Sequence, residues 1–305
     1  MNHDSPVTRT TPPVRTELAA PQCAPLPPHA APDLFRVYPM TNLSDLGSCR
    51  LCRGATTFAY KTIVLDKHAV SYYRCEQCCS LQTEPPYWLP EAYENASGSI
   101  DPGSARRVLD SYVLVYLVAW LFRCRKLLDF GGNTGLLCRL LRDQGYDAYS
   151  FDEYVIPIYA PHFVGSSAER YDLVSAFEVL EHLESPARDL DKIFGQRPNI
   201  VLATTELFSG QAADWWYLAP REGQHIFFYS EKAARLVAAR YGYNLLVGRD
   251  FLLFSRDPLT PVQRSLIALF GSPRIRQMLG AILLMRRGRG AQRDYDNLTQ
   301  RPAPD

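Results

Sequence analysis

The sequence lacks an excess of charge of either sign, since 33 Lys and Arg residues stand against 32 Asp and Glu residues. Such a balance disfavours bulk binding of RNA or DNA, which calls for a broad positive surface, and leaves local binding open. The sequence also lacks a long apolar run. Its longest, Val113 to Phe122, has about half the length of a membrane-spanning helix, so we expect a buried core helix there.

The start of the sequence lacks an apolar stretch of signal-peptide length, and its eight cysteines do not form the pattern of a small disulfide-linked domain. We therefore expect a protein of the reducing cytoplasm. What the chain does have is apolar residues, 47% of the total, which is enough to bury one large α/β core beside a small module.

Composition divides the chain into four regions. Residues 1–45 are crowded with Pro, Thr and Ala, a composition that predicts a disordered tail. Residues 46–90 contain two CxxC pairs, and residues 91–258 alternate predicted strands and helices. Residues 259–305 combine apolar and arginine clusters, which predicts a basic amphipathic C-terminal tail.

Apolar periodicity in the third region predicts an α/β domain. Helices are expected at residues 105–122, 136–144, 187–194 and 231–240. Strands are expected at residues 126–130, 147–151, 171–177, 199–204, 244–247 and 251–255, the last two as a hairpin. This alternation predicts a mostly parallel, doubly wound sheet.

A glycine cluster, Asp129 to Gly135 (DFGGNTG), lies between a predicted strand and a predicted helix. Glycines there allow a tight turn and a close approach of a ligand to the main chain. A nicotinamide-binding GxGxxG turn would need glycine where Phe130 stands, which argues against a dehydrogenase. Asn133 within the cluster is among the few residues other than glycine that tolerate a positive φ angle.

The next predicted strand ends in an acid, Asp152. A carboxylate at that point is suited to accept hydrogen bonds from both ribose hydroxyls of a nucleoside ligand, and Glu153 is the alternative. The segment Tyr171 to Leu183 (YDLVSAFEVLEHL) then follows as another strand that ends in acidic residues.

Together these features resemble the class I S-adenosylmethionine-dependent methyltransferases over residues 126–257. The glycine cluster is similar to their DxGxGxG turn, and the YDLVSAFEVLEHL segment is similar to their fourth strand. The resemblance implies a Rossmann-like, seven-stranded sheet and S-adenosylmethionine as cofactor, with Asp129 anchoring either the turn or the ligand's amino group. It implies this cofactor-binding set: Asp129, Gly131, Gly132, Gly135, Asp152 and Glu178.

Methyl transfer to a hydroxyl needs a base, and His225 is the candidate that titrates near neutral pH. It lies in a loop that faces the cofactor cleft in such folds; the alternative is a histidine that only holds the loop by hydrogen bonds. The aromatic run Asp214 to Tyr217 precedes it, and suits either stacking on sugars or bases, or packing in the core.

Glu178, Glu181 and His182 form an ExxEH cluster with two interpretations. The cluster is similar to one in small-RNA 2′-O-methyltransferases that holds a divalent ion such as Mg²⁺, and His225 would complete it; His182 would then share the catalytic role. In the other interpretation these residues only line the cleft. Methylation of an RNA end is accordingly the alternative function, and a non-catalytic cofactor-binding scaffold is a third.

The two cysteine pairs predict a structural zinc site. Cys49, Cys52, Cys75 and Cys78 have the spacing of a closed tetrahedral Cys₄ site, in which Cys79 is the alternative to Cys78. Paired with the downstream domain, this module resembles the N-terminal zinc-binding region of bacterial methyltransferases, several of which modify nucleotide-linked sugars. The resemblance implies a small acceptor, a sugar, nucleotide-sugar or glycan, rather than nucleic acid.

The C-terminal tail also has two interpretations. Its apolar residues and the basic cluster Arg286, Arg287 and Arg289 can pack on the domain with a solvated basic end, or can contact a membrane surface peripherally.

Overall fold

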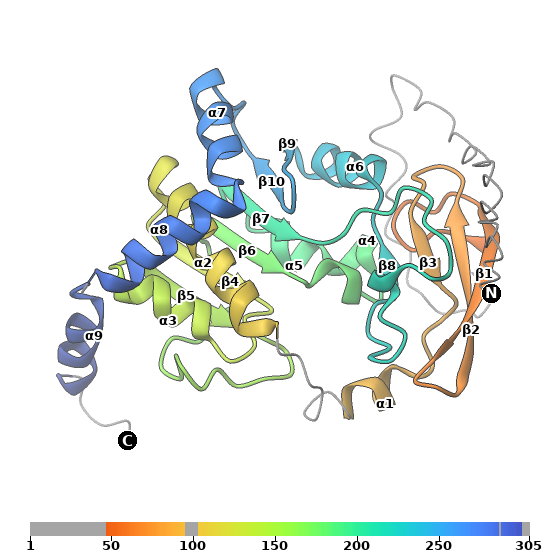
Figure 1. Ribbon diagram of the computed structural model, residues 1–305, viewed down its shortest axis with the longest axis horizontal. Coiled ribbons are helices and arrows are strands. Elements are labelled where there is room, and N and C mark those ends of the chain that lie inside the picture. Colours follow the sequence, from red (N-terminus) through yellow and green to blue (C-terminus); the bar gives the residue numbers. More distant parts are fainter. Residues whose placement is uncertain (1–46, 95–102, 287, 301–305) are drawn as a thin grey trace, which may run out of the picture.

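The computed structural model describes residues 47–94, 103–286 and 288–300. The predicted tail at residues 1–45 lies outside these ranges. Two sheets make up the fold, one of six strands and one of four. The larger sheet lies among helices, and the smaller one lies at the far side of the molecule, next to the ends of the larger sheet's central strands (Figure 1).

The larger sheet has the order β5-β4-β6-β7-β10-β9. Its strands are β4 (Lys126–Phe130), β5 (Asp147–Phe151), β6 (Leu173–Phe177), β7 (Ile200–Thr204), β9 (Asn244–Val247) and β10 (Leu252–Ser255). The first four are parallel, and β10 runs antiparallel to both β7 and β9, which confirms the doubly wound sheet and its terminal hairpin.

The expected seventh strand is reduced to a single bridge. Ser150 of β5 pairs in parallel with Val164 alone, through bonds from Ser150 N to Phe163 O (2.9 Å) and from Gly165 N to Ser150 O (2.8 Å). Gly165 fits there because a Cβ atom would lie 2.6 Å from Leu128 Cδ1. The edge therefore holds one residue pair rather than a strand.

Alternate side chains of the larger sheet are buried in two separate cores, one on each face, as expected of a pleated sheet covered on both faces. One face buries Leu128, Val174 and Val201 with residues of α5 (Asp191–Phe194) and α6 (Glu231–Tyr241), and with Leu190, which follows α4 (Pro186–Asp189). The other face buries Leu127, Leu173 and Leu202 with residues of α2 (Ser104–Leu121) and α3 (Leu136–Asp143).

Local signals fix several helix ends. Ser230 caps α6 through a bond from Ala233 N to its hydroxyl (3.0 Å), as an N-cap serine does. The helix expected at residues 187–194 is split at Leu190 into α4 and α5. The apolar run Val113 to Phe122 falls within and just after α2, whose residues Tyr112 to Val115 are buried. Within the described ranges, no helix is both long and apolar enough to cross a bilayer.

The smaller sheet combines residues far apart in the chain. Its order is β1-β2-β3-β8, with β1 (Thr56–Val64), β2 (His68–Cys75), β3 (Leu81–Thr83) and β8 (Phe227–Phe228). The last strand comes from the segment that follows β7, so the methyltransferase-like region completes the sheet of the cysteine module. The short helix α1 (Leu89–Glu94) follows β3 and packs in the core of this sheet through Leu89 and Ala92.

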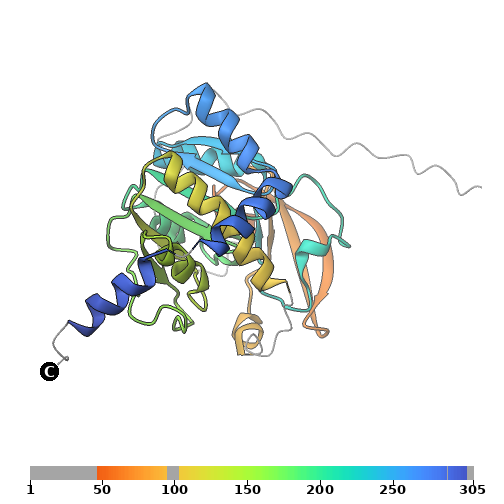
Figure 2. The ribbon, with the colours of Figure 1, turned by 60° about the vertical axis from the view of Figure 1, so that its left-hand side comes forward.

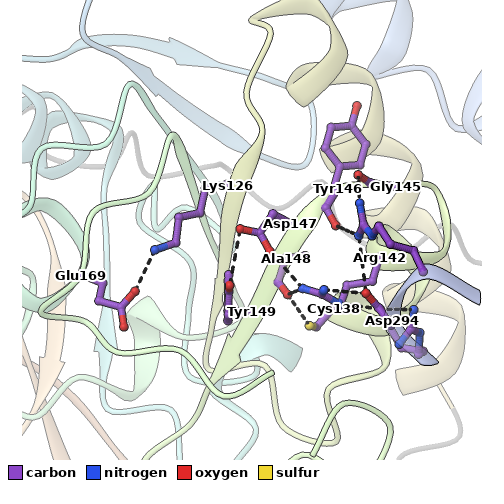
Figure 3. A network of polar contacts seen from close by, with 12 residues as sticks. Lys126, Cys138, Arg142, Gly145, Tyr146, Asp147, Ala148, Tyr149, Glu169 and Asp294 are labelled. Carbon is purple, nitrogen blue, oxygen red and sulfur yellow. Dashed lines mark hydrogen bonds and ion pairs between the residues drawn. The ribbon is translucent and has the colours of Figure 1, made fainter. Parts of the chain in front are cut away.

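Three helices, α7 (Pro261–Phe270), α8 (Pro273–Met285) and α9 (Gly290–Thr299), form the C-terminal region. Helix α8 crosses α2, and α9 projects at the end of the molecule (Figure 2). A buried ion pair fastens α9: Arg142 of α3 donates to both carboxylate oxygens of Asp294, at 2.8 and 2.7 Å (Figure 3). These helices thus pack on the domain.

Candidate functional site

The glycine loop between β4 and α3 has the backbone that its sequence predicts. Gly131 and Gly135 have φ angles of 73° and 75°, and Asn133 has 46°. A Cβ atom on Gly132 would lie 2.3 Å from Ser150 Oγ, so a side chain does not fit there. The loop is held by its neighbour strand, since the amides of Gly131 and Gly132 both donate to Phe151 O.

Asp129 lies at the carboxyl end of β4 and is 6% exposed. Its Oδ1 accepts a bond from the hydroxyl of Ser175 at 2.9 Å, while Oδ2 has no hydrogen-bond partner in the part of the chain that the structure describes. Burial raises the pKa of Asp129 to about 7. A buried carboxylate with an open oxygen suits an ammonium group, so the residues present fit the amino group of an adenosyl amino acid.

Asp152 follows β5, as predicted, and its carboxylate accepts hydrogen bonds from main-chain amides. Oδ1 accepts from the amides of Tyr154 (2.9 Å) and Val155 (3.0 Å), and Oδ2 accepts from Asn133 N (3.0 Å). A carboxylate has about four acceptor positions, so a ligand hydroxyl still has room beside Asn133. The alternative acid, Glu153, forms an ion pair with Lys192 instead.

Glu178 begins the turn after β6 with a φ angle of 52°. Its amide donates to Thr204 Oγ1 (3.1 Å), and the Thr204 hydroxyl donates to Glu178 Oε1 (2.7 Å). A non-glycine residue in this conformation is strained and is held by its neighbours. The second carboxylate oxygen, Oε2, lies 3.4 Å from the hydroxyl of Tyr217.

The structure brings Glu181, His182 and His225 together, with one ligand atom of each within 4.8 Å of the others. Glu181 is fully buried, and its pKa is raised to about 8 by burial and by the nearby Glu178. Burial lowers the pKa of His182 to about 3. Glu181 Oε2 and His182 Nδ1 are both buried without a hydrogen-bond partner among the described residues.

His225 presents one ring nitrogen to this group. Its Nδ1 lies 2.7 Å from the carbonyl oxygen of Tyr217 and donates to it, so Nε2 carries the lone pair, 4.0 Å from Glu181 Oε1. Burial lowers the pKa of His225, which keeps the ring neutral near pH 7. The unprotonated nitrogen can accept a proton or bind a cation.

Tyr217 is a site residue that sequence reasoning missed. Its hydroxyl donates to Glu181 Oε1 at 2.8 Å and lies 3.4 Å from Glu178 Oε2. The sequence left the aromatic run open to stacking or to core packing; of its aromatic side chains, Trp216 is strongly exposed, at 72%, and Tyr217 is buried. Its position between two glutamates cannot be read from the spacing of the three residues.

The loop that carries His225 is fixed from both sides. Ile226 N donates to Glu181 O (2.9 Å), while Ile226 O accepts from Thr83 N (3.1 Å) and from the Arg50 guanidinium. Helix α1 adds a third attachment, because Ala92 O accepts from Gln224 Nε2 at 3.1 Å. His225 therefore sits where the cysteine module meets the large sheet.

The four cysteines named by the sequence converge in one buried group. The Sγ atoms of Cys49 and Cys78 are 3.6 Å apart, and those of Cys52 and Cys75 are 3.5 Å apart. Thiolates at about 2.3 Å from a tetrahedral Zn²⁺ would be roughly 3.8 Å apart, so the group fits that ion. Cys78, not Cys79, belongs to the group.

Both CxxC turns close alike. The residue after each second cysteine has a left-handed backbone, with φ of 63° at Arg53 and 62° at Cys79. Each of these amides donates back to the carbonyl oxygen of the first cysteine of its pair, Cys49 (2.9 Å) or Cys75 (3.1 Å). The matched turns aim all four thiols at one point.

The family of this domain follows from a comparison of sequences. Residues 104–247 match the family described as "Methyltransferase domain", and the range contains the glycine loop, Asp152 and the ExxEH cluster. The chain carries a class I S-adenosylmethionine-dependent methyltransferase domain. This methyltransferase has no match among curated proteins.

Several solved methyltransferases are similar to part of this chain. The methyltransferase domain of bacterial CtHen1 is 20% identical, with a TM-score of 0.36 over 49% of this chain and 98% of that one. Magnesium protoporphyrin IX methyltransferase (ChlM) from Synechocystis PCC 6803 is 14% identical, with a TM-score of 0.39 over 56% and 96%. An O-methyltransferase family protein from Burkholderia thailandensis is 14% identical, with a TM-score of 0.39 over 51% and 57%. Scores this low say nothing about the acceptor.

Proposed function

We propose that this methyltransferase methylates a hydroxyl group of a small acceptor, a sugar or sugar-containing metabolite, with His225 as general base. The observation that carries the proposal is the tautomer of His225. Its Nδ1–H is committed to Tyr217 O at 2.7 Å, which leaves Nε2 as an acceptor that faces Glu181 and His182. A neutral imidazole in this position can take the hydroxyl proton as the oxygen attacks.

The cofactor's role and the protein's role are separate. Bound S-adenosylmethionine supplies the electrophilic methyl group. Gly131, Gly132 and Gly135 leave the loop backbone open to it, Asp129 holds its amino group, and Asp152 orders the loop through Asn133 while accepting from its ribose. Because these contacts bind and orient, they make the transfer effectively unimolecular.

The preference for a sugar has one support in the structure. Trp216 presents an exposed ring next to the buried Tyr217, with ring centroids 5.3 Å apart. An exposed indole beside polar groups is a suitable stacking surface for a sugar ring. The nucleotide-sugar or glycan class itself comes from the resemblance to bacterial methyltransferases with a zinc-binding region.

The cysteine module has a supporting role in this proposal. A structural Zn²⁺ held by Cys49, Cys52, Cys75 and Cys78 fixes β2 and β3, and β3 pairs with β8, the strand next to His225. The module at residues 46–90 is thus a positioning element for the base rather than a separate binding domain.

A second candidate is methylation assisted by a divalent cation, with the 2′-hydroxyl of an RNA end as acceptor. The observation that favours it is the pair of orphaned buried atoms, Glu181 Oε2 and His182 Nδ1. Together with His225 and the neighbouring Glu178 they form a mixed carboxylate and imidazole set that fits Mg²⁺ or a softer divalent ion. The cation would orient the acceptor hydroxyl and lower its pKa.

Labelled cofactor tests both candidates. The protein is incubated with methyl-labelled S-adenosylmethionine and a fractionated cell extract, with and without a chelator that removes Mg²⁺ but leaves the cysteine site loaded. His225→Gln should lower labelling of the acceptor about a hundredfold, within the usual range for a lost general base. The exposed His162 gives the matched control, His162→Gln, which should keep full labelling.

The outcomes separate the proposals. Label in a small hydroxylated metabolite that persists without divalent ions supports the general-base proposal. Label in RNA that disappears with the chelator and with Glu181→Gln supports the cation-assisted one. Label on a nitrogen or carbon atom of the acceptor would overturn both proposals, because both assume that the methyl group is transferred to a hydroxyl.

A further inference from the structure

Helix α8 exposes apolar side chains on the face that points away from the protein. Met278, Ile282 and Met285 are 59%, 50% and 75% exposed, and their spacing of four and three residues places them on one face of the helix. Arg274, also exposed, lies one turn before Met278 on the same face. A surface helix of a globular domain normally presents a polar outer face, whereas the outer face of α8 is mainly apolar.

The inner face of α8 is already occupied. Leu283 is buried, Arg276 is buried in an ion pair with Asp250, and a Cβ atom on Gly280 would lie 3.2 Å from Val113 of α2. Because the helix is anchored by this face, rotation cannot bring the exposed side chains inward. Among residues 47–94, 103–286 and 288–300, none covers the apolar face.

The charge around α8 indicates which kind of partner fits its exposed face. The sequence from residue 261 to residue 290 contains six arginines and no Asp, Glu or Lys. The arginines are Arg264, Arg274, Arg276, Arg286, Arg287 and Arg289. Arg276 is neutralised by its buried ion pair with Asp250, so the other five supply the local positive charge. They stand out in a chain whose net charge is only +1, and in the sequence they lie on both sides of the exposed apolar stripe.

We infer that the exposed face of α8 binds the surface of an anionic membrane. Arginines at lipid headgroups and aliphatic side chains that enter the acyl boundary are the two parts of an interfacial amphipathic helix. A phosphate backbone would use the arginines but leave three aliphatic side chains in water, so a membrane fits better than a nucleic acid. The inference is independent of the acceptor and of the base.

Vesicle co-sedimentation of the full-length protein tests the inference. We expect the protein to sediment with vesicles of phosphatidylcholine and anionic phosphatidylglycerol, and to remain in solution with phosphatidylcholine alone or at high salt. The double variant Met278→Asp/Ile282→Asp should lower the bound fraction at least about tenfold, because both charges oppose the surface.

The chain offers a matched control. Ile63 in β1 is 54% exposed, close to the 50% of Ile282, and lies in the small sheet away from α8 (Figure 1). Ile63→Asp should bind vesicles like the wild type. If the double aspartate variant does not fold, as judged by its circular dichroism, Arg274→Glu/Arg289→Glu supplies the same test through charge alone.

Three results would overturn the inference. Equal binding to neutral and anionic vesicles, or none to either, would remove the electrostatic basis. Binding of a single-stranded RNA oligonucleotide that is lost in Arg274→Glu/Arg289→Glu, without vesicle binding, would assign the face to nucleic acid. A dimer in light scattering that Ile282→Asp dissociates would assign it to a second copy of the chain.

Discussion

The two sheets of this protein are stabilised in different ways. The large sheet carries apolar side chains on both faces and is covered by helices, with α9 fastened by the buried pair Arg142 and Asp294. The small sheet has a largely exposed first strand, and part of its core is borrowed from the segment after β7, including Tyr217, Ile226 and Phe228. Because the small sheet supplies only part of its own core, we expect it to depend on the proposed zinc site, and its strand β8 follows His225.

The largest effect is expected when the proposed zinc site of the small sheet is disrupted. Cys75→Ser should abolish stoichiometric zinc binding and lower the first thermal transition by roughly 10 °C, since a loss of about 3–4 kcal/mol has that effect in a protein of this size. Cofactor binding by the large sheet should stay within about threefold, while acceptor labelling is lost. Metal analysis, calorimetry and labelling measure the three quantities.

The control for this variant is Cys124→Ser, which changes a buried thiol outside the cluster. It should keep full zinc content. If Cys75→Ser instead abolished cofactor binding and left a single transition, the two sheets would fold as one unit and the comparison would fail.

The next effect concerns the large sheet alone. Asp294→Asn removes the charge partner that binds two nitrogens of the buried Arg142 and leaves it only the longer ion pair with Asp147 at 3.3 Å. The variant should lower the free energy of unfolding by about 3 kcal/mol. Denaturant unfolding measures this loss, and zinc content should not change. Asp143→Asn removes a more exposed carboxylate that pairs with Arg139 and should cost about 1 kcal/mol or less.

A smaller effect lies at the junction between the sheets. Arg50 donates to the carbonyl oxygens of Glu184 and Ile226, so Arg50→Met loosens the His225 loop without touching the cofactor site. We expect kcat to fall on the order of tenfold, because misplacement of a catalytic group is costly, and cofactor affinity to stay unchanged. Arg188→Met, at a 70% exposed side chain, should leave both quantities unaltered; a loss of cofactor affinity in Arg50→Met would contradict the junction role.

The smallest effect is a pH dependence of cofactor binding by the large sheet. Burial raises the pKa of Asp129 to about 7, so its carboxylate is mostly protonated at pH 6 and mostly ionised at pH 8. Since an ammonium group binds the ionised form, affinity for S-adenosylmethionine should rise about tenfold from pH 6 to pH 8. Calorimetry measures the affinity, and Asp129→Asn should bind weakly with a flat profile; a flat profile in the wild type would show that Asp129 does not contact the amino group.

Local sequence predicted the elements that local forces control. The ranges expected for β4, β5 and β9 coincide with the observed ones, because short apolar runs bounded by turn residues have few alternatives. The split of one helix at Leu190 and the reduction of the seventh strand to one bridge were not predicted. Both depend on contacts with other elements, which no window of neighbouring residues contains.

The candidate site divides in the same way. The cysteine set could be named from its spacing. The glycine loop and Asp152 could be named from residue types at the ends of predicted strands, together with the resemblance to methyltransferases. The contact of Tyr217 with Glu181, and the pairing of β8 with β3, could not. These partners are separated by 36 residues in the first case and by more than a hundred in the second.

The sequence by itself therefore determined that the chain has a doubly wound sheet, a glycine-lined turn with a positive φ at Asn133, and four cysteines in two turns, since each is set by the residues within a few positions. Only the tertiary structure decided where the candidate base His225 lies. Its neighbour Ile226 donates its amide to Glu181, in the turn after β6, and accepts from Thr83 of β3 at its carbonyl oxygen. Such a junction exists only once both sheets have folded.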